Sequence, residues 1–166
     1  MAVQGDTLEF PLRGDTRALP AQRVIDAADR IVCPGFIDMH AHTGLVIFTK
    51  PCHEPKVRQG ITTELIGVDG NSYALLRGED LDHFITLNAG LDGRPPAGMR
   101  WSSVGEYLAA FDNRVAVNVA YVMGNSPSRI SAMGWSDRWP TESELQGMKD
   151  FVRQGMAEGA WGIPPG

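Results

Sequence analysis

Apolar and polar residues alternate with two different periods along residues 34–166, which predicts strands separated by helices. Short runs of apolar and β-branched residues predict buried strands at residues 35–42, 61–68 and 115–122, with a fourth strand from residue 160. Helical signals predict helices at residues 54–59, near 81–88, at 104–111 and between 141 and 159. Strands that alternate with helices are typical of an α/β fold with a parallel sheet.

The last predicted helix carries the strongest signal. Thr141 and Glu144 form a Thr-x-x-Glu capping box, and Gly159 is the residue type that commonly follows a helix. Between them, apolar residues recur at helical spacing and predict one buried face. These residues are Leu145, Met148, Phe151, Val152 and Met156.

The start of the chain does not continue this alternation. Residues 1–22 are polar, contain Gly and Pro, and are expected to be irregular. Apolar residues on both sides of a turn predict a hairpin that pairs residues 24–26 with residues 30–32. We therefore divide the chain into a domain of residues 1–33 and a domain of residues 34–166.

Two histidines stand at the end of the first strand of the larger domain. His40 and His42 are separated by one residue, so alternation along a strand points both side chains to the same face. Asp38 is expected on that face too, where it would orient a histidine from behind. Two imidazoles side by side at the end of a strand are typical of a metal site, and we expect both to be ligands.

A carboxylate follows the next strand. Asp69 comes after residues 61–68 and precedes Gly70. A strand, a helix and a second strand form a βαβ unit, so the ends of both strands meet at one edge of the sheet. Sites of parallel α/β folds are built at that edge. Asp69 is therefore a candidate third ligand, and the alternative is a plain turn residue of an Asp-Gly pair.

Composition narrows the function classes. The net charge is −5 and no basic patch is interleaved with aromatic residues, so a nucleic-acid partner is not expected. No apolar run is long enough to cross a bilayer, and the N-terminus has no signal-peptide pattern, so we expect a cytoplasmic protein with no membrane partner. The other histidines, His53 and His83, are expected at the surface.

Two segments resemble a known family. CPGFIDMHAHTG and EPKVRQGITTELIGVDGNSYA are similar to the amidohydrolase superfamily, and most of all to its N-acyl-D-amino-acid deacylase (D-aminoacylase) branch, over residues 23–162. The resemblance implies a metal-dependent (β/α)8 barrel of the TIM type beside a small β-sandwich, with zinc or another divalent metal as the cofactor. It also implies that the substrate is a small N-acylated D-amino acid, whose amide bond is hydrolysed.

The chain departs from this family in length and in residues. A (β/α)8 barrel takes about 250 residues, whereas this chain has 166 and no histidine after His83. We therefore expect an N-terminal fragment of a longer enzyme, with about the first four barrel strands, a remnant of the sandwich, and the catalytic aspartate beyond residue 166. Gly44 stands where relatives usually have Asp, and Asp69 stands where some relatives have a Cys ligand and others have Asp.

Two other functions remain open at this stage. The same fold supports other amidohydrolase chemistry, such as the hydrolysis of cyclic amides or ureido groups by dihydroorotase-like or hydantoinase-like enzymes. The chain is alternatively an inactive orphan fragment.

Overall fold

The computed structural model describes residues 2–5, 7–9 and 20–164. The chain divides into two compact units, Met1–Pro34 and Gly35–Gly166. Each unit is described by itself.

The smaller unit holds one short hairpin. Strands β1 (Ala2–Gln4) and β2 (Thr7–Glu9) pair antiparallel, so the prediction of irregular structure is wrong for these residues. The hairpin predicted from residues 24–26 and 30–32 is also wrong. A turn does form there, with Arg30 N–H donating to Ala27 O at 3.0 Å, but no strand flanks it. Its apolar side chains are exposed, and a hairpin that buries nothing is marginal in water.

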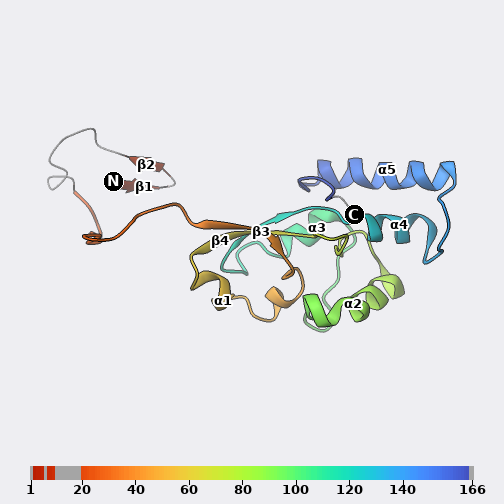
Figure 1. Cartoon of the computed structure of the whole chain (residues 1–166), viewed down its shortest axis with the longest axis horizontal. Helices are drawn as coiled ribbons and strands as arrows, with labels where there is room; N and C mark the ends of the chain where they lie inside the picture. The colour runs from red at the N-terminus through yellow and green to blue at the C-terminus, as the bar shows by residue number, and fades with distance from the viewer. Residues whose placement is uncertain (1, 6, 10–19, 165–166) are drawn as a thin grey trace. The chain divides into compact units, whose positions relative to one another are not determined.

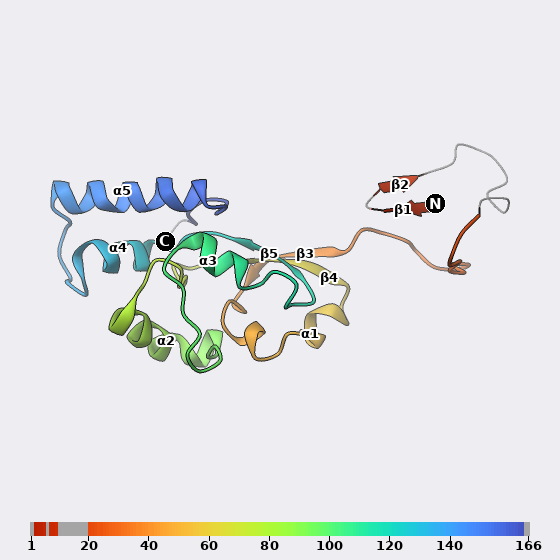
Figure 2. The same cartoon turned by 180° about the vertical axis from the view of Figure 1, so that it is seen from behind.

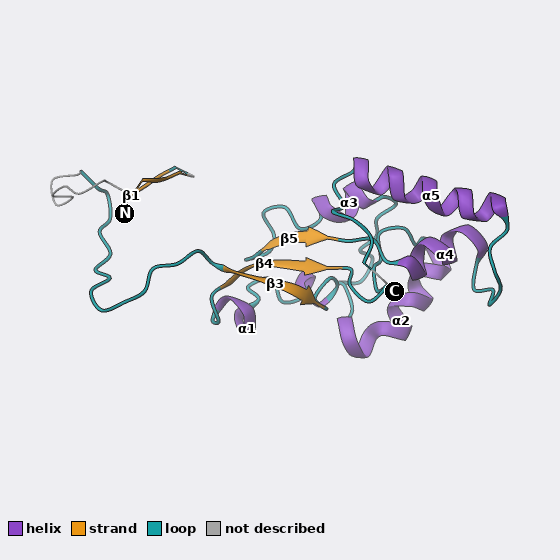
Figure 3. Ribbon diagram, turned by 45° about the horizontal axis from the view of Figure 1, so that its top comes forward, coloured by secondary structure: helices purple, strands orange, loops and turns teal. Residues whose placement is uncertain are grey.

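The larger unit is an α/β structure around three parallel strands. They are β3 (Phe36–Ala41), β4 (Ile61–Ile66) and β5 (Asn118–Tyr121), in the order β3-β4-β5 (Figure 3). All three predicted strands are confirmed, although each is shorter than expected. At the end of β4, Gly67 has a φ of 88°, and a Cβ there would lie 1.9 Å from the carbonyl oxygen of Val122. Only glycine fits this close approach.

Strand β3 contains a bulge that breaks the expected alternation. Asp38 pairs with Glu64 and Ala41 pairs with Ile66, so three steps along β3 match two steps along β4. Asp38 and Ala41 therefore face the covered side of the sheet. The side chain of His40 lies on the other side and is 59% exposed. The prediction that Asp38 points with the two histidines is wrong for this reason.

Helices and loops cover part of the sheet, and most of the helices were expected. The segments predicted near 54–59, 81–88 and 104–111 are helical, and α5 has the complete Thr141–Glu144 capping box. Helix α4 was not predicted. The helices are α1 (Glu54–Val57), α2 (Gly78–Asp92), α3 (Val104–Ala109), α4 (Asn125–Met133) and α5 (Glu142–Ala157), with a 3-10 turn at Val46–Phe48. In the described residues, no helix is both long and apolar enough to cross a membrane.

Helices α4 and α5 lie side by side (Figures 1 and 2). The expected apolar face of α5 is only partly covered, because Val152 packs against the core while Leu145 and Met156 remain exposed. Gly155 is buried, and a Cβ there would lie 2.1 Å from the sulfur of Met123. This glycine therefore lets α5 approach the core closely.

The fourth predicted strand is present only as paired backbone. Residues 160–164 are not assigned as a strand. Trp161 N–H donates to Tyr121 O, and Met123 N–H donates to Gly162 O, both at 2.8 Å. The chain after α5 therefore runs beside the end of β5.

The core depends on the segment between β4 and β5, which contributes a group of buried aromatic residues. They are Tyr73, Phe84, Trp101, Tyr107 and Phe111. The hydroxyl of Tyr107 donates to Gly44 O at 2.8 Å, and a Cβ at Gly44 would lie 2.6 Å from that hydroxyl. This segment therefore packs directly behind the end of β3.

Candidate metal centre

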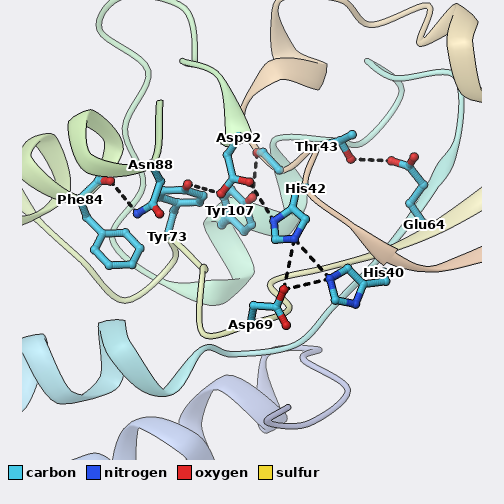
Figure 4. Close-up of polar contacts among 11 residues, drawn as sticks. His40, His42, Thr43, Glu64, Asp69, Tyr73, Phe84, Asn88, Asp92 and Tyr107 are labelled. Carbon is cyan, nitrogen blue, oxygen red and sulfur yellow. Dashed lines mark hydrogen bonds and ion pairs between the residues drawn. The ribbon is translucent and has the colours of Figure 1, made fainter. Parts of the chain in front are cut away.

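His40, His42 and Asp69 converge at the carboxyl edge of the sheet (Figure 4). The Nε2 atoms of the two histidines are 3.3 Å apart. Asp69 Oδ2 lies 2.9 Å from His40 Nε2 and 3.4 Å from His42 Nε2. The structure therefore brings together all three residues that the sequence suggested as ligands. Among the described residues, no other group of His, Cys, Asp and Glu side chains is grouped in this way.

Local backbone geometry aims Asp69 at the histidines. The chain leaves β4 through Gly67 and turns at Asp69, which has a φ of 54°. Aspartate tolerates this left-handed conformation better than most residues do. Asn71 N–H closes the turn by donating to Val68 O at 2.9 Å. Asp69 is therefore a turn residue, as the alternative interpretation held, and its carboxylate also faces both imidazoles.

A buried acid, Asp92, holds His42 from behind. Its Oδ1 lies 3.1 Å from His42 Nδ1, and its Oδ2 accepts a hydrogen bond from the hydroxyl of Tyr73. If Asp92 accepts the Nδ1–H of His42, the lone pair of Nε2 is directed toward His40 and Asp69. Burial raises the pKa of the Asp92 carboxyl, against the opposing effects of Tyr73 and His42.

Sequence reasoning missed Asp92. It lies 50 residues from His42, at the end of α2, where Asp92-Gly93 reads as part of a Gly/Pro-rich turn. One signal was available in the sequence. An acid in the long segment that joins two strands can reach a site formed at the ends of those strands. That signal does not distinguish Asp92 from the other acids of the segment.

Asp38 does not have the expected contact with an imidazole. Its Oδ1 accepts a hydrogen bond from the backbone N–H of His40 at 3.0 Å, and its Oδ2 accepts one from Lys56 Nζ. The hydrogen bond from Lys56 lowers the pKa of the Asp38 carboxyl, and the His40 amide lowers it further. Asp38 therefore holds the bulged backbone, while Asp92 occupies the place behind a histidine.

His53 is also placed differently from the expectation. It was expected at the surface, but it is buried and lies 3.0 Å from Glu64 Oε1 through its Nε2. Glu64 is completely buried on β4 and also accepts from Thr43 and Lys56. His83 is exposed on α2, as expected.

The three donor atoms fit a divalent metal ion. Ligand atoms about 2.0–2.1 Å from a tetrahedral zinc ion stand about 3.3 Å apart. The observed separations of 2.9, 3.3 and 3.4 Å are close to that value. Two imidazole nitrogens and a carboxylate oxygen are also donors that suit zinc and related ions. The exposed side of His40 and Asp69 leaves room for a further ligand.

Comparison with known families matches residues 23–163 to the amidohydrolase family. The chain belongs to this family, which confirms the resemblance carried by the PGFIDMHAH segment.

Several of the similar proteins are deacylases. The chain is 32% identical to N-acyl-D-aspartate deacylase and 34% identical to N-acyl-D-glutamate deacylase, both from Alcaligenes xylosoxydans xylosoxydans, over 92% of this chain and 30% of each relative. A crystal structure of N-acyl-D-glutamate deacylase from Bordetella bronchiseptica, in complex with zinc and a phosphonate inhibitor, is 35% identical with a TM-score of 0.74. That match covers 90% of this chain and 31% of the deacylase. The chain thus spans about a third of the length of these relatives.

Proposed function

We propose that this chain contributes to a metal-dependent amidohydrolase that hydrolyses the amide bond of N-acyl-D-amino acids. The convergence of His40, His42 and Asp69 at one edge of a parallel sheet carries the proposal. The deacylases that resemble the chain support the substrate class, because three named relatives act on N-acylated D-amino acids or are D-aminoacylases.

The proposed architecture is the first part of a (β/α)8 barrel. The parallel order β3-β4-β5, with the chain after α5 running beside β5, supports this. The two faces of a barrel strand differ in burial, and here Ala41 and Ile66 are buried whereas the side chain of His40 is exposed. Residues 1–33 would then be the remnant of the sandwich.

In this proposal, His40, His42 and Asp69 bind a divalent ion, with zinc as the first choice. Zinc is present in the Bordetella bronchiseptica structure, and another related structure is described as having a binuclear metal center. A bound ion supplies Lewis acidity, which polarises the amide carbonyl and makes a water more acidic. Asp92 keeps His42 in the tautomer that offers its Nε2 lone pair, with Tyr73 holding the other oxygen of Asp92. We assign no general acid or base to this chain.

Metal binding tests the site. Zinc titration of the chain, followed by calorimetry, should show binding that is lost in a His40→Ala/His42→Ala variant. We expect weak affinity, because the chain offers three donors and binding must also order the exposed His40 and Asp69 side chains. Equal binding by the wild-type chain and the double variant would remove the basis of the proposal.

The reaction is tested in the complete gene product that contains this sequence. With zinc, it should release the free amino acid from N-acetyl-D-glutamate or N-acetyl-D-methionine, and the His40→Ala/His42→Ala variant should not. The chain of 166 residues alone should show no turnover, since proton transfer by a placed acid or base contributes on the order of 10²–10⁴-fold. Hydrolysis of hydantoin or dihydrouracil without action on either acetylated amino acid would instead favour the cyclic-amide alternative.

A further inference from the structure

The two histidines lie between two hydrogen-bonded anchors that end on the same buried carboxylate, Glu64. On the upstream side, Asp38 Oδ1 holds the backbone N–H of His40 at 3.0 Å. Asp38 Oδ2 accepts from Lys56 Nζ, which lies 3.3 Å from Glu64 Oε1. The backbone of the first histidine is thus connected to Glu64 through two charged side chains.

On the downstream side, the connection is direct. Thr43 follows His42, and its hydroxyl donates to Glu64 Oε2 at 2.5 Å (Figure 4). The third partner, His53 Nε2, lies 3.0 Å from Glu64 Oε1 and fixes the carboxylate from the side of α1. The segment from Asp38 to Thr43 therefore carries both histidines between two points that cannot move independently.

Glu64 is a buried acid, and packing alone does not explain why an acid stands at this position. The carboxylate is completely buried on β4, where the next residue on the same face is the apolar Ile66. A buried charge is costly unless it is paired and hydrogen-bonded, and apolar residues of similar volume are often equally stable in its place. Both carboxylate oxygens of Glu64 contact polar groups, which lie on the segment that carries the histidines and on α1 beside it.

We propose that Glu64 is a positioning residue for the metal ligands His40 and His42, and that it acts through Thr43 and through Lys56 and Asp38. The bulge makes this arrangement possible, because it places Asp38 beside Glu64 while the side chains of both histidines meet at Asp69. Glu64 itself does not contact the ligand atoms. This inference rests on the proposed metal site and adds the device that holds its two nitrogens 3.3 Å apart.

The test compares zinc affinity in the 166-residue chain, measured by competition with a chromophoric chelator. Thr43→Val removes the hydroxyl and keeps the shape, whereas Thr43→Ser keeps the hydroxyl. Thr43→Val and Glu64→Gln should each weaken zinc binding on the order of 10-fold or more, as loss of outer partners of metal ligands commonly does. Thr43→Ser should stay near the wild-type affinity. The Thr43→Val/Glu64→Gln variant should lose no more affinity than Glu64→Gln alone, since Glu64→Gln already perturbs the hydrogen bond that Thr43→Val removes.

A second readout separates positioning from stability. Cobalt(II) bound to the wild-type chain and to Thr43→Val should give different visible absorption bands, because the bands report the arrangement of the ligands. The control is Thr141→Ala, which removes the side-chain cap of α5, a hydroxyl that accepts from Glu144 N–H at 3.3 Å and contacts none of the three ligands. It should lower the melting temperature without altering zinc affinity or the cobalt spectrum.

The outcomes are distinguishable. If Thr43→Val and Glu64→Gln lower the melting temperature but leave zinc affinity and the cobalt spectrum unchanged, Glu64 is merely structural and the inference is wrong. If the wild-type chain and the His40→Ala/His42→Ala variant bind zinc equally, the metal site itself is wrong, and the positioning role fails with it.

Discussion

Replacing Asp92 by Asn should weaken metal binding while leaving the fold in place. The carboxylate serves two donors, the Nδ1–H of His42 at 3.1 Å and the hydroxyl of Tyr73. An amide has one oxygen, so in Asp92→Asn the two donors compete for it. If the amide NH2 faces His42, the imidazole must carry its proton on Nε2 and loses the lone pair that would bind the ion.

The expected loss of zinc affinity depends on which of the two donors keeps its hydrogen bond to the amide oxygen of Asn at position 92. If Tyr73 turns to accept from the amide, His42 keeps its tautomer and loses only the basicity that a carboxylate lends it, near the lower end of a 10–100-fold loss in affinity. If the tautomer reverses, the loss lies near the upper end. These limits correspond to about 1.4–2.8 kcal/mol, at about 1.4 kcal/mol for each factor of ten. Tyr73→Phe removes the competitor, so adding it to Asp92→Asn should recover part of the loss.

The assay is zinc competition, together with long-range ¹H–¹⁵N spectra that report the protonated nitrogen of His42. The matched control is Asp82→Asn on the same helix, which loses an exposed ion pair with Arg100 of little expected energy. A folded Asp92→Asn variant that binds zinc as the wild type does, with Nδ1 still protonated and its shift unchanged, would refute the role given to Asp92.

Other predictions concern the turn, the last helix and its cap. Asp69→Asn keeps a residue that tolerates the φ of 54° but removes the anionic oxygen, so zinc affinity should fall with little change in melting temperature. The pKa of Glu144 is lowered to about 2, first by its hydrogen bond with Arg138. The stability it adds is therefore present above its ordinary pKa and lost as the pH falls from about 4.5 to about 2, so the melting-temperature difference between wild type and Glu144→Gln should shrink over that range. Gly155→Ala should destabilise α5 by about 1–3 kcal/mol through overpacking. Gly147→Ala, which meets no atom within 4 Å, should stabilise it by about 0.5–1 kcal/mol; urea unfolding of both variants checks the pair.

Features with a local signature could be predicted from the sequence. The strand that carries His40 and His42 is marked by its own apolar run, and the cap of α5 by residues three positions apart. The position of Asp69 followed from one further rule, that the strands of a βαβ unit lie parallel. Each of these inferences uses short-range information or a general rule of topology.

The rest depends on contacts between distant residues. The bulge in β3 is defined only by its register with β4, so alternation placed Asp38 on the wrong face. Asp92 acquires its role because α2 ends behind His42, and His53 is buried because Glu64 on the neighbouring strand binds it. In the sequence, Glu64 is only a polar residue within a predicted strand. Its hydrogen bond with Thr43 spans 21 residues, and no periodic pattern of residues indicates it.

The fit between Gly44 and Tyr107 constrains how this sequence can change over generations. Any side chain at Gly44 would begin 2.6 Å from the phenol oxygen, so the substitutions accepted there depend on a residue 63 positions later. An aspartate at position 44, as expected for relatives of this branch, would become tolerable only after Tyr107 had become smaller or had shifted. The order of the two steps therefore matters, since the first step at position 44 would be selected against while the same step after a change at position 107 would be admitted. The two positions should show strong epistasis, so that the effect of a substitution at one position depends on the residue at the other.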